Sequence, residues 1–99
     1  MNFSATFLFK ARKELLEAWV WYEDREPGLG DKFTEQVFSI VKIIEQFPDR
    51  YPERHKRYRE ALVRIFPYII IYRIQQRKKM VVSVFVFHTR RNTKKKRII

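Results

Sequence analysis

The chain has 99 residues and a formal net charge of +11, with 45% hydrophobic and 16% aromatic residues. This length and composition indicate one globular domain and exclude a disordered chain. Cysteine is absent, which excludes disulfides and thiolate metal sites. No apolar run approaches the ~18 residues of a membrane span, and no signal-peptide pattern appears, so a cytoplasmic location is expected.

The charges are distributed unevenly along the chain. Residues 1–53 carry seven Lys/Arg and ten Asp/Glu, whereas residues 54–99 carry fifteen Lys/Arg and a single acid, Glu60. A half this basic indicates a polyanionic partner, which is RNA, DNA or an acidic protein. The alternative is a generally basic surface that serves only solubility.

The N-terminal half predicts a strand followed by two helices. Alternating apolar residues mark the strand, and these are Phe3, Ala5, Phe7 and Phe9. Two apolar stripes at helical spacing follow. The first consists of Ala11, Leu15, Ala18 and Tyr22, and the second of Phe33, Val37, Ile40, Ile44 and Phe47. The segment EPGLGD between them predicts a turn with Asp31 as a helix cap, so the helices should form an antiparallel hairpin.

The C-terminal half predicts three strands. Pro48 ends the second helix, and the segment PDRYPERHKR predicts a polar loop. The strands YREALVRIF, YIIIYRI and MVVSVFVFH follow, with the basic hairpin turn QQRKK before the last. The second and third of these strands are apolar on both sides, which predicts central positions in the sheet.

The predicted fold is therefore α+β. It comprises an N-terminal strand, a two-helix antiparallel hairpin and a three-stranded antiparallel meander, with the helices packed on one face of the sheet. A single domain over residues 1–92 and a basic tail over residues 93–99 are expected. No glycine-rich phosphate loop and no metal-ligand cluster appears, so neither a metal site nor a cofactor is predicted.

Four segments occur in an order and spacing that resemble the RelE/ParE superfamily of bacterial toxins, also called plasmid stabilisation proteins. These are AWVWYEDREPGLGDKF, FPDRYP, REALVRIFPYIIIYRI and FHTRRN. The resemblance extends from about Phe7 to Asn92 and implies the toxin of a type II toxin–antitoxin module. Such a toxin inhibits growth and is held silent by a cognate antitoxin that wraps it.

The resemblance implies an antitoxin that covers the outer groove of the helical hairpin or adds to a sheet edge. Three apolar residues outside the strictest core stripes are candidates for this contact: Trp21, Leu29 and Phe38. The alternative is that they pack locally beneath the hairpin turn. One departure from the family pattern is that Leu8 and Phe9 stand where relatives carry a polar helix cap.

The family's two known activities leave three readings open. The chain poisons DNA gyrase, or it cleaves mRNA in the ribosomal A site, or it is a non-enzymatic relative that only binds nucleic acid or a partner. Metal-independent RNA cleavage requires a base, an acid and a cation at the phosphate. The candidates for these roles are His88, Arg90, Arg64 and Tyr72.

One comparison favours gyrase. Many RNA-cleaving relatives carry an arginine three residues before the tyrosine that Tyr72 matches, and here that position is Ile69. Thr89 replaces a tyrosine that often follows the last strand. Strand alternation also places Tyr72 and Arg73 on opposite faces. The candidates for binding a nucleic acid or another target are Arg59, Arg73, Arg91, Lys94, Lys95, Lys96 and Arg97.

Overall fold

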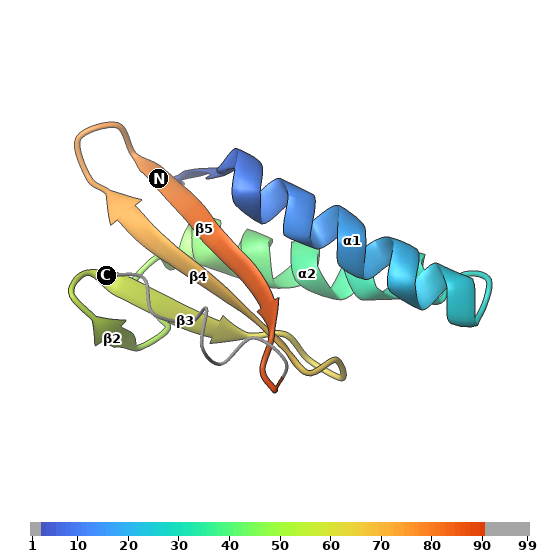
Figure 1. Ribbon diagram of the computed structural model, residues 1–99. Helices are drawn as coiled ribbons and strands as arrows, with labels where there is room; N and C mark the ends of the chain where they lie inside the picture. Colours follow the sequence, from blue (N-terminus) through green and yellow to red (C-terminus); the bar gives the residue numbers. More distant parts are fainter. Residues whose placement is uncertain (1–2, 91–99) are drawn as a thin grey trace.

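The computed structural model describes residues 3–90 and contains two helices packed together on one face of a five-stranded sheet (Figure 1). Its elements are β1 (Ser4–Phe7), α1 (Phe9–Arg25), α2 (Leu29–Gln46), β2 (Glu53–His55), β3 (Tyr58–Leu62), β4 (Tyr68–Gln75) and β5 (Met80–His88). The predicted α+β architecture is confirmed. One element was not predicted: β2 lies in the segment expected to be a loop. Among residues 3–90, neither helix is long and apolar enough to cross a membrane.

The sheet order β1-β5-β4-β3-β2 places β4 and β5 at the centre, as their apolar character on both sides predicted. β2, β3, β4 and β5 pair antiparallel, whereas β1 pairs parallel to β5. A parallel pair needs a long crossover connection. The helical hairpin provides the first part of this connection, and it thereby lies over one face of the sheet.

The two predicted helical stripes form most of the core on the helix side. Ala11, Ala18 and Tyr22 are buried, as are the first four residues of the α2 stripe. Two residues that were predicted to belong to these apolar patterns are exposed instead. Phe9 is 79% exposed because the chain already turns into α1 there, and Phe47 is 52% exposed because it follows the last turn of α2.

The turn between the helices is closed by acidic side chains. Glu23 accepts hydrogen bonds from the backbone N–H groups of Gly28 (2.7 Å) and Gly30 (2.9 Å), which stand at the start of α2. The prediction that Asp31 caps this helix was wrong. Its carboxylate instead accepts a hydrogen bond from the Trp19 indole at 2.9 Å. The cap position is Gly28, whose φ of 91° suits glycine.

The two faces of the sheet carry separate apolar clusters. The side facing the helices includes Tyr68, Ile70 and Tyr72 of β4. The opposite side, called here the far face, carries Ile69, Ile71, Val82, Val84 and Phe87. A β-bulge lies between the two halves of the β4–β5 pairing: Ile71 stands opposite Phe85 and Tyr72 opposite Ser83, which leaves Val84 as the extra residue.

Candidate functional site

An apolar groove lies between α1 and α2, and it is called here the hairpin groove. Its volume is about 360 Å³, and it is lined by Leu15, Leu16, Trp19, Thr34 and Phe38. Leu16 is 61% exposed and Phe38 is 47% exposed. Adjacent large apolar side chains on a surface are typical of an interaction site. The arrangement suits the apolar face of a partner helix.

The three residues predicted to contact an antitoxin lie in different surroundings. Phe38 lines the hairpin groove. Leu29 is half-buried and packs against the core. Trp21 lines a second cavity, where the Arg25 guanidinium lies 3.5 Å from the centroid of its ring. Leu16 also lines the hairpin groove but was not among these candidates. Its place beside Leu15 and outside the core stripe was a usable signal in the sequence.

The sheet edges are poorly suited to accept an added strand. The N–H groups of Phe3, just before β1, and of Ala5 on β1 donate to the carbonyl and the carboxylate of Glu45, both at 2.9 Å. The other edge strand, β2, has three residues and directly follows Pro52. An edge strand is a template only where its backbone groups are free and sufficiently long.

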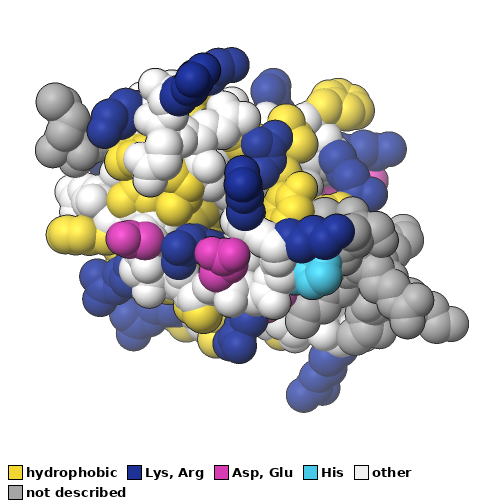
Figure 2. Space-filling model, turned by 90° about the vertical axis from the view of Figure 1, so that its left-hand side faces the viewer, with side chains coloured by type: hydrophobic (Ala, Val, Ile, Leu, Met, Phe, Trp, Pro, Cys, Tyr) yellow, Lys and Arg dark blue, Asp and Glu magenta, His cyan; other side chains and the backbone are white. Residues whose placement is uncertain are grey.

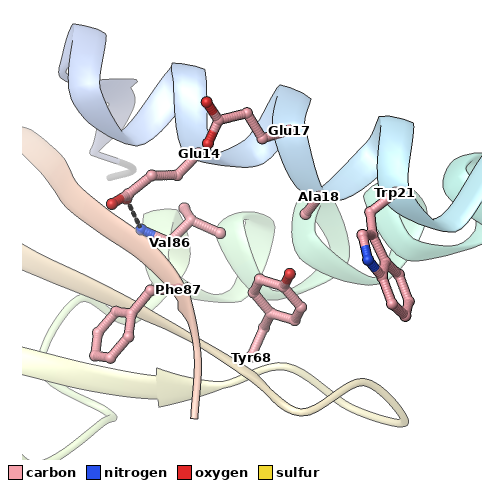
Figure 3. Close-up of a pocket in the computed structure, with 7 residues that line it drawn as sticks. All are labelled: Glu14, Glu17, Ala18, Trp21, Tyr68, Val86 and Phe87. Carbon is pink, nitrogen blue, oxygen red and sulfur yellow. Dashed lines mark hydrogen bonds between the residues drawn. The ribbon is translucent and has the colours of Figure 1, made fainter. Parts of the chain in front are cut away.

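The second cavity lies between α1 and the sheet and has a volume of about 240 Å³. Its lining residues are Glu14, Glu17, Ala18, Trp21, Tyr68, Val86 and Phe87 (Figure 3). Glu14 accepts a hydrogen bond from the backbone N–H of Val86 at 2.8 Å, and Tyr68 points from β4 toward α1. This bond ties the first helix to the central strand, which gives Glu14 a structural role.

His88 stands at the end of β5, where the predicted catalytic candidates should meet. Its ring lies against Tyr68, with centroids 5.3 Å apart, and its Nδ1 accepts a hydrogen bond from the Arg90 backbone N–H at 3.1 Å. Arg64 is exposed in the loop between β3 and β4. This loop and the end of β5 are joined by the Thr89 N–H, which donates to the carbonyl of Pro67 at 2.8 Å.

The side chains of Tyr72 and Arg59 both donate hydrogen bonds to the loop that follows α2. The Tyr72 side chain is fully buried, and its hydroxyl donates to the Pro48 carbonyl at 2.6 Å. Burial raises the pKa of this phenol to about 12, because the charged form is disfavoured away from water. Arg59 donates to the carbonyls of Asp49 (3.2 Å) and Tyr51 (2.6 Å). Both side chains therefore hold the loop that follows α2.

The far face offers no cationic side chain at the position where RNA-cleaving relatives place an arginine. Ile69 is 7% exposed and belongs to the apolar cluster of that face. Leu62, its partner on β3, is apolar as well. Aliphatic side chains such as these cannot stabilise the charge that develops on a phosphate during cleavage.

Basic side chains gather at the opposite end of the sheet, around the β4–β5 turn. Arg73 lines an open groove there with Arg57, Arg77 and Lys78. Figure 2 views this end of the molecule and shows Lys and Arg side chains spread over it between apolar patches, with few acidic groups. The turn segment QQRKK was predicted to be basic, but its proximity to Arg57 depends on the strand order.

Within residues 3–90, no group of three or more His, Cys, Asp or Glu side chains could hold a metal ion. Five of the predicted target-binding residues lie outside the described residues. These are Arg91, Lys94, Lys95, Lys96 and Arg97.

Comparison with known proteins identifies the family. The family model described as the ParE toxin of the type II toxin–antitoxin system, parDE, matches residues 6–93. No curated protein sequence matches the chain. Several solved structures are similar in fold, and three of them are compared with this chain. A chromosomal ParDE toxin–antitoxin system from P. aeruginosa aligns with a TM-score of 0.75 and 17% identity, over 87% of this chain and 95% of that chain.

The other two structures come from E. coli. The intact RelBE toxin–antitoxin complex aligns with a TM-score of 0.69 and 20% identity, over 90% of this chain and 99% of that chain. The isolated RelE toxin aligns with a TM-score of 0.68 and 19% identity, over 94% and 90% respectively. The family match covers most of the sequence, and these structures share the hairpin-on-sheet fold. The chain therefore belongs to the ParE toxin family of type II toxin–antitoxin systems.

Proposed function

We propose that this toxin arrests growth in the cytoplasm by acting on DNA gyrase, and that it does so without cleaving RNA. The observation that carries the proposal is the apolar far face around Ile69. Two of the predicted groups are committed to the fold, because the catalytic candidate Tyr72 and the target-binding candidate Arg59 both donate to backbone carbonyls. The match to the ParE family supports the same choice.

The proposal is tested by two assays run side by side on the purified toxin. Gyrase supercoiling of relaxed plasmid should be inhibited, and primer extension on translated mRNA should show no new cleavage sites. RNA cleavage that disappears in a His88→Ala variant would instead support the alternative, in which His88, Arg90 and Arg64 act on the ribosome-bound message. Growth arrest without either effect would contradict both mechanisms.

The hairpin groove is the surface that we assign to the cognate antitoxin. Its apolar lining and two exposed side chains suit a helix, whereas on the edge strand β1 the Ala5 N–H already donates to Glu45. A Leu16→Glu variant should lose antitoxin affinity by about 10-fold or more, since a buried charge without a partner is strongly disfavoured at an interface.

A matched control tests this assignment. Leu62 is 62% exposed, almost the same as Leu16 at 61%, but it lies on β3 outside the groove. A Leu62→Glu variant should therefore bind the protein encoded beside the toxin gene as tightly as the wild type does. Equal losses of affinity in both variants, measured by calorimetry, would show that the groove is not the antitoxin site.

A further inference from the structure

Two turns that are distant in sequence form a basic groove at one end of the sheet. Arg57 comes from the β2–β3 turn, Arg73 from the end of β4, and Arg77 and Lys78 from the β4–β5 turn. The groove is open and has a volume of about 460 Å³. Its remaining lining residues are Ile74, Gln75 and Gln76, so no carboxylate lines it.

This groove is remote from the end of the sheet that carries His88. Tyr68 pairs with His88, whereas Gln75 at the other end of β4 lines the basic groove. A strand rises by about 3.3 Å per residue, so the two ends are separated by roughly 23 Å. One phosphate group cannot contact both places, and the groove is therefore a site of its own.

The chemistry of the lining identifies the class of ligand. Three arginines offer planar donor forks that match the oxygens of a phosphate, and Lys78 adds a point charge. The two glutamine amides add neutral donors. Ile74 is the one apolar residue in the lining and no aromatic side chain lines the groove, so the groove lacks the aromatic anchors that dominate protein interfaces.

We infer that this groove binds the phosphodiester backbone of a nucleic acid, without reading its sequence. Exposed cations on an open groove can contact successive phosphates along a strand. The groove holds no aromatic side chain on which a base could stack. The inference does not depend on the choice between gyrase and the ribosome, because it concerns a different part of the surface.

The test compares two triple variants of the full chain that lose the same charge. One carries Arg57→Gln, Arg73→Gln and Arg77→Gln. The other carries Arg12→Gln, Lys13→Gln and Lys32→Gln, which replace exposed cations on α1 and α2. Urea unfolding establishes that both variants are folded. Fluorescence anisotropy then measures binding of a short DNA duplex, a single-stranded RNA of equal length and a polyglutamate peptide over a range of salt concentrations.

The groove variant should flatten the dependence of log K on log salt by about 0.9 per lost phosphate contact on duplex DNA, or about 0.7 on single strands. Three contacts would change the DNA slope by about 2.7, and the control variant should change it by less than about 1. A change of slope with DNA alone, or with RNA alone, supports the site and shows which nucleic acid it binds. Equal effects in the two variants, or a loss confined to polyglutamate, would overturn the inference.

Discussion

The two helices pack tightly at Gly30, and a Gly30→Ala variant tests this contact directly. A Cβ atom at this position would lie 2.6 Å from the backbone oxygen of Trp19 and 2.8 Å from Oε1 of Glu23. Both distances are shorter than van der Waals contact. The Trp19 oxygen belongs to the α1 backbone, so the helices would have to move apart.

Opposing effects set the size of the change in the free energy of unfolding. Alanine is favoured over glycine within a helix by about 1 kcal/mol. Overpacking in a tight contact costs about 1–3 kcal/mol. Displacing the Glu23 carboxylate also weakens its hydrogen bonds to Gly28 and Gly30, and a bond to a charged group contributes about 1.5–3 kcal/mol. The free energy of unfolding should therefore fall by about 2 kcal/mol in the Gly30→Ala variant.

Urea denaturation followed by circular dichroism measures this change as a lower midpoint with an unchanged slope. A Gly28→Ala variant is the matched control, because a Cβ there has nothing within 4 Å while φ is +91°. It should lose about 1–2 kcal/mol from the backbone conformation alone. If Gly30→Ala unfolds at the same or a higher urea concentration than the wild type, the close helix contact is refuted.

Three further predictions concern polar groups within the fold. The neutral Tyr72 phenol contributes stability below its unfolded pKa of 10.0, and this contribution is lost as pH rises toward about 12. Between these values the wild type should lose about 3 kcal/mol of unfolding free energy relative to Tyr72→Phe; parallel pH profiles would contradict this. Glu14→Ala leaves the Val86 N–H without its acceptor, so unfolding free energy should fall by about 1–3 kcal/mol and the Val86 amide should exchange faster; unchanged exchange would exclude the role of Glu14. Arg59→Met removes the donor to the Asp49 and Tyr51 carbonyls, so limited proteolysis should cut the loop after α2 faster, and an unchanged cleavage pattern would count against this anchor.

The sequence alone was sufficient for the order of the main elements and for the helix stripes. Phe33, Val37, Ile40 and Ile44 are buried as their spacing predicted, because helical periodicity depends only on residues close in the chain. The central place of β4 and β5 was predictable for a similar reason, since strands covered on both faces must be apolar throughout. The family resemblance also followed from local segments in a fixed order.

Tertiary structure decided which side chains are available for function. Tyr72 looked like a catalytic candidate, but it belongs to the core cluster on the helix side of the sheet, where its hydroxyl donates to the Pro48 carbonyl. The bulge at Val84 shifts the alternation of β5, and a local pattern cannot show where such a shift occurs. Arg57 meets Arg73 only because β3 pairs with β2 and β4. Contacts of this kind depend on strand pairing between distant segments, and the spacing of residues along the chain does not contain them.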